Sequence, residues 1–394
     1  MFREKEGFLS ALKGKLPARK ECENGMLQKI RLCKKCYNRT GIKCLIADPY
    51  DCFICSGILW KIDEIADDIV KSLDGYEFET FLIGSRIHGS LKAIEDYLKL
   101  EEEKSLKYQF NKELGREIEI RTGKKLSFKN PDVTIVYDLE NLNYSIYIKP
   151  LYIYGRYKKR VRGLSQTRWL CPKCNGKGCL LCNWTGKKYV SVEELISEPI
   201  REFVMGTDAV LHGAGREDVD ARMLGNGRPF IVEVKNPKRR CIDLRELERL
   251  VNENCRGKVE VLNLKLAEAK DIEFLKSARF KKIYRVKVLF GRDLSDDEIR
   301  RAIEELKNRD IHQRTPLRVL HRRSDLLRVR KVYDIELLFL RRNIAVLRIE
   351  ADSGLYIKEF ISGDQGRTRP SLSEVLNVEA RVEKLDVIRI EGGL

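Results

Sequence analysis

Apolar residues along this 394-residue chain change their spacing several times, and each change predicts an element of secondary structure. From Gly57 to Leu73 they recur at steps of three and four residues, the spacing of an amphipathic helix. Residues 76–84 alternate between apolar and polar positions and end at a glycine, so we expect a strand. A helical pattern with a break follows at about 87–123, and then strands at 132–137 and 144–149. The first part of the chain is therefore expected to be a small α/β unit.

The second half of the chain mixes the same two patterns. Helices are expected at 192–203, 245–251 and 293–307, and extended segments at 230–235, 259–264, 281–291, 333–340, 344–351 and 385–390. On the strand at 281–291, Tyr284 falls on the same face as Val286 and Val288, because alternate side chains share a face. The Tyr284 ring is therefore expected to lie with the apolar side chains.

Composition indicates a basic, globular protein. Lys and Arg number 77 against 60 Asp and Glu, a net charge of +17, and the 43% of hydrophobic residues is enough for two or three domains with buried cores. Such a charge favours a polyanionic partner. An acidic membrane surface would also attract it, but no apolar run approaches the roughly 18 residues of a membrane-spanning helix. We expect a nucleic-acid partner and no membrane association.

The twelve cysteines indicate metal sites rather than disulfides. The first residues lack the apolar stretch of a secretory signal, so the chain is expected in the reducing cytoplasm, where disulfides are rare. Two Cys-x-x-Cys pairs match a four-cysteine zinc site: Cys33, Cys36, Cys52 and Cys55. Four unrelated buried cysteines are the alternative, and Cys22 and Cys44 fall outside the pattern as core residues or substitute ligands. Four thiolates leave no open position for water, so this zinc is expected to be structural.

A second group of four cysteines lies in the middle of the chain. It consists of Cys171, Cys174, Cys179 and Cys182, two Cys-x-x-Cys pairs whose separation of four residues includes two glycines that allow a tight loop. This knuckle is expected to hold a second structural zinc ion, with an iron–sulfur cluster as the alternative. We interpret the knuckle as a joint between the front and back halves of the chain.

Two segments concentrate positive charge. Residues 151–163 interleave tyrosines with lysines and arginines, which suits RNA because bases stack on tyrosine while cations meet phosphates. An edge strand with a solvated basic flank would give the same pattern. Residues 309–331 carry a dense run of arginines, which favours contact with a phosphate backbone. A solvated helix face is the alternative for this second segment.

The stretch from Gly215 to Phe230 is the strongest candidate for a site. Its sixteen residues include three carboxylates, three arginines and three glycines, which leaves little for a core. Glycine lets the backbone approach a ligand closely, arginine holds carboxylates or phosphates with a two-pronged fork, and an aspartate so held stays ionised at neutral pH. The alternative is a solvated turn, since these residue types favour turns. A strand is expected to leave this turn at Phe230.

Several motifs resemble those of RNA-modifying enzymes. The helix and strand order of the first part, with Gly155–Lys158 and Gln166–Trp169, resembles a THUMP domain, an RNA-binding module of tRNA-modifying enzymes. The run Ser353–Lys358 is similar to the Ser-x-Gly-Thr-Tyr-Ile-Arg motif of the TruB family of pseudouridine synthases. With the first cysteine group and the whole Gly215–Phe230 string, the likeness extends over nearly the entire chain. The chain resembles the Pus-ten family of tRNA pseudouridine synthases in its archaeal form.

This resemblance implies a fold and roles for individual residues. The fold class is α+β, with an N-terminal zinc-binding, THUMP-like α/β domain before a catalytic domain whose mixed, largely antiparallel sheet is flanked by helices. The domains are 1–60 (zinc-binding segment), 61–168 (THUMP-like, RNA-binding), 169–190 (zinc knuckle) and 191–394 (catalytic). The site comprises a catalytic aspartate (Asp220), stacking tyrosines (Tyr284, Tyr356), base-pocket residues (Ile357, Leu385) and cations that keep the aspartate ionised (Lys358, Arg222). Ordinary core positions are the alternative for both tyrosines.

The choice of catalytic aspartate depends on the family pattern that is followed. Relatives with Gly-Arg-x-Asp would nominate Asp218, whereas those with a glycine five residues after the aspartate nominate Asp220, because Gly225 stands at that distance. We favour Asp220 and keep Asp218 as the fallback. Lys358 stands where the TruB motif has arginine, so its contact with the aspartate would be a point charge rather than a fork.

The implied reaction isomerises uridine to pseudouridine in the T-arm of tRNA, at uridine 55 and also at uridine 54. The aspartate acts as nucleophile or as base, and no catalytic cofactor or nucleotide takes part. The implied partner is tRNA, bound by a monomer. A methyltransferase and a zinc-type tRNA-binding protein without isomerase activity are the competing functions, although no glycine-rich cofactor loop follows a predicted strand.

Overall fold

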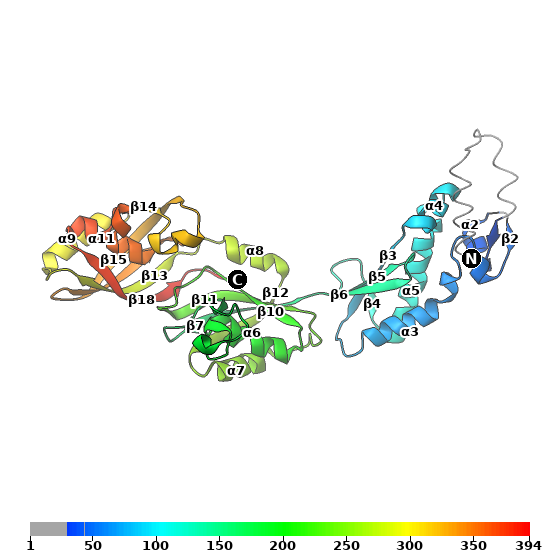
Figure 1. The fold of residues 1–394 in the computed structure, drawn as a ribbon, viewed down its shortest axis with the longest axis horizontal. Helices are drawn as coiled ribbons and strands as arrows, with labels where there is room; N and C mark the ends of the chain where they lie inside the picture. Colours follow the sequence, from blue (N-terminus) through cyan, green and yellow to red (C-terminus); the bar gives the residue numbers. More distant parts are fainter. Residues whose placement is uncertain (1–29, 43) are drawn as a thin grey trace, which may run out of the picture. The chain divides into compact units, whose positions relative to one another are not determined.

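The computed structural model describes residues 30–42 and 44–394, and the chain divides into two compact units, 1–149 and 150–394 (Figure 1). Each unit has its own hydrophobic core. The candidate ligand Cys22 and about half of the expected 1–60 segment lie outside the described residues. In the described part of the chain, no helix has both the length and the apolar character needed to cross a membrane.

The first unit is a four-stranded sheet with the order β4-β3-β5-β6. The strands are β3 (Thr80–Arg86), β4 (Lys125–Leu126), β5 (Val133–Asp138) and β6 (Asn143–Ile148), and the helices are α3 (Ile62–Ser72), α4 (Gly89–Leu98) and α5 (Leu106–Thr122). Every second residue of β3 and β5 is buried in a core shared with α3 and α5. The helices were predicted correctly, and the expected break in the helical pattern separates α4 from α5.

A small cysteine-bearing segment precedes this sheet. It contains β1 (Arg31–Leu32), β2 (Leu45–Ile46), α2 (Lys34–Thr40) and the short helices η2 (Pro49–Asp51) and η3 (Ile58–Trp60). β1 and β2 pair in parallel. Cys33 and Cys36 lie at the start of α2, and their side chains belong to the same core as the sheet.

The second unit is built on one ten-stranded sheet. The path is β12-β7-β11-β18-β13-β16-β15-β14-β17, with β10 beside β11. The strands are β7 (Leu151–Lys159), β10 (Asp208–Gly213), β11 (Ala221–Lys235), β12 (Val259–Ala267), β13 (Lys282–Phe290), β14 (Asp310–Arg314), β15 (Leu327–Arg341), β16 (Ile344–Ala351), β17 (Thr368–Arg369) and β18 (Ala380–Ile390). β11 and β18 run parallel, and the other neighbours in the sheet are antiparallel. The sheet is therefore mixed and largely antiparallel, as expected.

Six α-helices flank this sheet (Figure 1). They are α6 (Val192–Phe203), α7 (Leu244–Cys255), α8 (Ala269–Ser277), α9 (Asp296–Leu306), α10 (Ile357–Ser362) and α11 (Leu372–Leu376). α6 has the predicted bounds because Ser191 and Glu194 form a capping box at its start. The second cysteine group lies between β8 (Trp169–Leu170) and β9 (Lys187–Tyr189), which form a separate antiparallel pair.

β11 corrects the expected glycine-rich turn. The strand begins directly after Asp220, pairs with β18 through residues 221–223, and pairs with β7 from Arg228 onward. The register shifts between these two stretches, where Gly225 has a φ of +57°. A Cβ atom on Gly225 would lie 1.7 Å from the carbonyl oxygen of Ile388, so a side chain has no room there. The glycines therefore serve a bulge within a strand rather than a turn before one.

β7 corrects the expected RNA-stacking strand at 151–163. The segment belongs to the second unit and lies between β11 and β12, so it is neither part of the THUMP-like sheet nor an edge strand. Tyr154, Tyr157 and Lys159 are buried, at 3%, 0% and 0% exposure. Neighbouring side chains of a central strand point to opposite faces of the sheet, and both faces are covered by a core. In β7, aromatic and basic residues occupy some of these buried positions. Tyr154 and Tyr157 are therefore not a surface for stacked bases.

Candidate active site

A cavity of about 820 Å³ lies beside the junction of β11, β13 and β18. It is lined by residues 215–221 before and at the start of β11, by Tyr284 of β13, by Leu385 and Val387 of β18, and by residues 353–358 before and at the start of α10. The pairing of Ala221 with Leu385 and of Tyr284 with Val387 fixes these strands in register. Segments far apart in the sequence thus form one concave site, as expected for a ligand-binding cleft.

Asp220 and Lys358 meet at this cavity. The Lys358 ammonium donates to both carboxylate oxygens of Asp220, at 2.8 Å to Oδ1 and 2.6 Å to Oδ2. Burial alone would raise the pKa of Asp220, but the hydrogen bond and charge of Lys358, helped by Arg318, hold that pKa below its ordinary value. Asp220 is therefore an ionised carboxylate at neutral pH.

Asp218 lies beside this pair and is held by two cations. Arg318 contacts both of its carboxylate oxygens at 3.2 Å, and the Lys358 ammonium is 3.4 Å from Oδ2. The Arg318 guanidinium also donates to Glu359 at 2.6 Å. The Asp218 side chain is 33% exposed against 65% for Asp220. Asp220 is thus the carboxylate more open to a ligand.

The two candidate tyrosines both line the cavity in different settings. Tyr284 is 7% exposed, and burial raises its pKa to about 12 although Arg228 opposes the shift, so the phenol is neutral. Tyr356 is half-buried, and its hydroxyl accepts a hydrogen bond from Arg323 at 2.7 Å. Gln313 fixes the Tyr356 backbone by accepting from its N–H at 2.8 Å and donating to its carbonyl at 3.1 Å.

The remaining candidates divide between the cavity and the opposite face of the sheet. Ile357 and Leu385 are buried and line the cavity. Arg222 does not line it, because its guanidinium donates to both oxygens of Asp386, each at 2.8 Å. The expected contact between Arg222 and the catalytic aspartate is therefore replaced by a contact with Asp386.

Asp386 is the centre of a cluster that sequence reasoning missed. Asp386 is 4% exposed as a residue, and its carboxylate also accepts from Arg285 at 3.0 Å and from Arg162 at 2.7 Å. Burial alone would raise the pKa of Asp386, but the arginines hold it below the ordinary value. The charge of this region was visible in the sequence, but the convergence of three arginines on one carboxylate depends on strand pairing.

This cluster lies directly behind the site residues. Arg222, Asp386 and Arg285 face one another across β11, β18 and β13. Asp220 is two residues before Arg222, Tyr284 directly precedes Arg285, and Leu385 directly precedes Asp386. Neighbouring side chains on a strand point to opposite faces, so the cluster joins the three site-bearing strands from the face away from Tyr284 and Leu385.

The loop before β11 is also held from within the core. The buried Lys159 ammonium donates to the carbonyl oxygens of Leu164 at 2.9 Å and Asp218 at 3.0 Å. Glu217, whose side chain is fully buried, pairs with Arg228 at 2.8 Å and accepts from the Tyr157 hydroxyl at 2.9 Å. Glu217 is therefore a structural carboxylate, which separates it from Asp218 and Asp220 in the same stretch.

The basic segment 309–331 contributes to the rim of the cavity. It is not one helix, since it contains β14, the short helix η6 (Leu317–Arg322) and the start of β15. Four of its arginines line the cavity: Arg318, Arg323, Arg328 and Arg330. The density of positive charge predicted contact with an anion, but it did not show which arginines turn toward the site.

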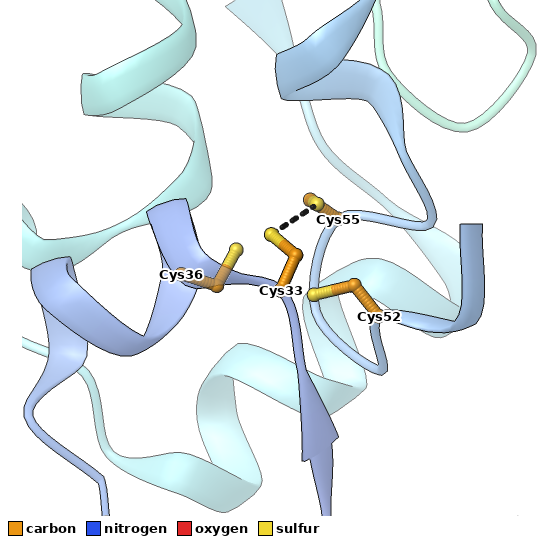
Figure 2. A group of neighbouring side chains, drawn as sticks. All are labelled: Cys33, Cys36, Cys52 and Cys55. Carbon is orange, nitrogen blue, oxygen red and sulfur yellow. Dashed lines mark hydrogen bonds between the residues drawn. The ribbon is translucent and has the colours of Figure 1, made fainter. Parts of the chain in front are cut away.

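Both four-cysteine groups have the geometry of a tetrahedral metal site. In each group the four sulfur atoms lie within 4.8 Å of one another, and Figure 2 shows the first group, in which Cys33 and Cys55 are 3.7 Å apart. In the second group Cys171 is 3.8 Å from Cys179, and Cys174 is 3.8 Å from Cys182. Bonds of about 2.3 Å to a tetrahedral zinc ion would separate sulfur atoms by roughly 3.8 Å. Either group can therefore hold such an ion, and Cys44 belongs to neither.

Known protein families match parts of both units of the chain. The family model described as "Pus10, C-terminal" matches residues 152–391, and the model "Pus10 THUMP domain, archaeal" matches residues 65–138. The tRNA pseudouridine synthase Pus10 of Archaeoglobus fulgidus is 49% identical over 363 residues, which are 92% of this chain and 100% of that protein. The tRNA pseudouridine synthase Pus10 of Methanothrix thermoacetophila is 42% identical, over 91% of this chain and 80% of that protein.

The THUMP match confirms the expected module but not the motifs used to find it. The expected motifs, Gly155–Lys158 and Gln166–Trp169, lie beyond residue 138 and in the second unit. Gln166 instead donates to the Tyr157 hydroxyl at 2.9 Å and to the Gly215 carbonyl at 2.8 Å. Gln166 therefore supports the loop before β11.

Proposed function

Because this chain belongs to the Pus10 family of tRNA pseudouridine synthases and is thus an isomerase that acts on tRNA, we propose that it modifies the T-arm, with Asp220 as the catalytic carboxylate. The proposed targets are uridine 55 and uridine 54. Family membership sets aside the methyltransferase and the binding protein without isomerase activity. Asp218 remains the fallback for the catalytic role.

The observation that carries this proposal is the ion pair between Asp220 and Lys358. It joins the loop before β11 to the start of α10, at a cavity whose lining includes Tyr284, Tyr356, Ile357 and Leu385. A uridine in a helix or a structured loop must leave its stack to reach such a site, and a flat ring then replaces the lost stacking. Tyr284 and Tyr356 would supply the stacking, and Ile357 and Leu385 would line the base pocket.

The proposed chemistry needs an ionised carboxylate near the sugar of the target. The N1–C1′ bond breaks, either because Asp220 attacks C1′ or because it removes the proton at C2′. The freed uracil turns and forms a bond from C5 to C1′. This bond displaces Asp220 from C1′ on the first route, and on the second route the proton returns from Asp220 to C2′. The C5 proton is then lost and N1 gains one, so substrate and product have the same atoms and no co-reactant is consumed.

Asp220 fits this role better than Asp218 on two physical grounds. Its side chain is the more exposed of the two, and its closest cation is a single lysine on the cavity wall. Asp218 is held by two cations, Arg318 on both oxygens and Lys358 on Oδ2, which leaves fewer of its lone pairs free for a substrate.

The test compares Asp220→Asn with Asp218→Asn on an unmodified tRNA transcript. Pseudouridine is detected at single positions as a carbodiimide adduct that resists mild alkali. Asp220→Asn is expected to abolish product at positions 54 and 55 while tRNA binding stays within about threefold, and Asp218→Asn is expected to retain activity. The opposite pattern would assign the role to Asp218, and product at other uridines with none in the T-arm would reject the proposed specificity.

We also infer that each four-cysteine group binds a structural zinc ion. Four sulfur ligands would close the coordination shell, so neither ion would meet the substrate. The ion at Cys33, Cys36, Cys52 and Cys55 would stabilise the core of the first unit, in which these side chains are buried. The ion at Cys171, Cys174, Cys179 and Cys182 would stabilise the hairpin of β8 and β9.

A further inference from the structure

The floor of the cavity contains a lysine that the proposed chemistry does not use. Lys282 begins β13 two residues before Tyr284, so the two side chains share a face of the sheet and stand roughly 7 Å apart. Lys282 is 6% exposed and lines the cavity. Its ammonium makes no hydrogen bond or ion pair with any of the residues that the structure describes, 30–42 and 44–394.

The charges around Lys282 do not balance. The charged groups that act on it are Arg228 on β11 and Glu217 in the preceding loop. Glu217 already pairs with Arg228 and accepts from Tyr157, so its oxygens are occupied. Two cations and one carboxylate leave an excess of one positive charge. A buried charge without a partner is costly, so the site favours an incoming anion.

Gly215 leaves an opening beside these cations. A Cβ atom at this position would lie 3.1 Å from the Lys282 ammonium and 3.2 Å from Nη1 of Arg228. Gly215 is exposed and lines the cavity with Lys282. A ligand that enters the cavity therefore meets glycine backbone, and not a side chain, next to the unpaired ammonium.

We propose that Lys282 binds a backbone phosphate of the tRNA strand that carries the target uridine. This inference rests on the proposed function. Uracil is neutral, and the phosphates are the full negative charges that RNA offers. A base stacked on Tyr284 has its own backbone within a short reach, which matches the separation of Lys282 from Tyr284 along β13.

The protonation of Lys282 gives this contact a signature. Burial and, to a smaller extent, the charge of Arg228 lower the pKa of Lys282 to about 7, against the opposing charge of Glu217. A bound phosphate would raise the pKa, so binding would take up a proton whenever the free site is neutral. The dissociation constant is therefore expected to rise up to tenfold per pH unit above pH 7, and this rise is expected to vanish in Lys282→Met.

The test is a double-mutant cycle. It combines removal of the Lys282 charge with removal of the charge on one RNA phosphate at a time. Synthetic T-arm stem–loops with one neutral methylphosphonate at each phosphate around the target are titrated with the full-length protein. One substitution is expected to weaken wild-type binding about tenfold, the size of one charged hydrogen bond. Lys282→Met should bind native RNA more weakly than wild type by the same factor. In this variant, a methylphosphonate at the sensitive phosphate should cause no further loss of affinity. Lys282→Arg should bind within about threefold of wild type.

Lys281→Met is the matched control. Its ammonium contacts the Tyr333 ring and lies 4.0 Å from Glu350, so it has partners outside the cavity. It should bind like wild type and show the full methylphosphonate penalty. Equal penalties in wild type and Lys282→Met would overturn the inference. If Lys282→Met does not fold, the wild-type scan decides, since no penalty above threefold at any phosphate would also overturn it.

These results are separable from the proposed function. Pseudouridine formation is measured on the native stem–loop before the binding cycle. Product in the stem–loop without coupling at any phosphate rejects the role of Lys282 alone. A stem–loop that yields no product rejects the T-arm proposal, and the same cycle is then run on the RNA segment that is modified.

Discussion

Replacing Lys358 by methionine should shift the pH dependence of the reaction rather than lower its rate evenly. Methionine keeps most of the length of the lysine side chain and removes the charge that contacts Asp220 at 2.6 Å. Burial would continue to raise the pKa of Asp220 after this change, and Arg318 would continue to lower it. We therefore expect a net rise in the pKa of the carboxylate.

The size of the rise follows from distance and exposure. Two unit charges about 2.7 Å apart interact by about 1.5 kcal/mol in bulk water, which is about one pKa unit. Water-like screening is appropriate because the Asp220 side chain is 65% exposed. The lowered pKa means that the active, ionised form is lost as the pH falls through that value, so in the variant this loss should begin about one unit higher.

The assay is single-turnover release of tritium from C5 of uridine in tRNA between pH 4.5 and 8.5. Relative to wild type, Lys358→Met should lose up to about two- to threefold more rate at pH 4.5 than at pH 8, because a rise of about one unit from a pKa below the ordinary value of Asp still leaves most of the carboxylate ionised at pH 5. Lys358→Arg keeps the charge, so its rate should fall at acid pH in the same range as that of the wild type. An acid limb that does not move in Lys358→Met, with a uniform fall in rate, would show that Lys358 does not control the ionisation of Asp220.

Two further predictions concern stability and metal. Gly225→Ala should destabilise the second unit by roughly 3 kcal/mol or more and lower its melting temperature by about 6–12 °C, because the added Cβ would clash with Ile388 at a φ of +57°. Gly257→Ala, at a φ of +70° with nothing within 4 Å, is the control and should cost only about 1 kcal/mol. Similar losses of stability in both variants would refute the clash. Elemental analysis should find two zinc ions per chain, one fewer in Cys33→Ser and in Cys174→Ser and two in Cys255→Ser, whereas iron in place of zinc would contradict the assignment.

Local signals in the sequence predicted much of the secondary structure. α6 and α9 begin at capping boxes and have a regular apolar stripe, so short-range patterns define them. β10 was missed because its six residues include a histidine and end at a glycine, which weakens the alternation. β7 was assigned to the wrong unit, because the partners of a strand can lie more than a hundred positions away in the sequence.

Long-range pairing also limits how much of a site can be predicted. Resemblance to a known family nominated Asp220, Tyr284 and Lys358, and the structure brings these residues to one cavity. Lys159 and Asp386 were missed, since a charged residue in a sequence looks solvated until its buried partners are known. The carbonyls that hold Lys159 and the arginines that hold Asp386 come from distant segments.

The cluster around Asp386 determines when the energetic cost of ordering the site is met. Arg222 of β11 and Arg285 of β13 already bind Asp386 of β18 in the free protein, and so fix the three strands against one another. The entropy lost in aligning the carboxylate, the aromatic ring and the aliphatic wall is then met during folding and not during encounter with RNA. A preorganised site of this kind leaves the binding energy of the tRNA available to extract the uridine from its stack.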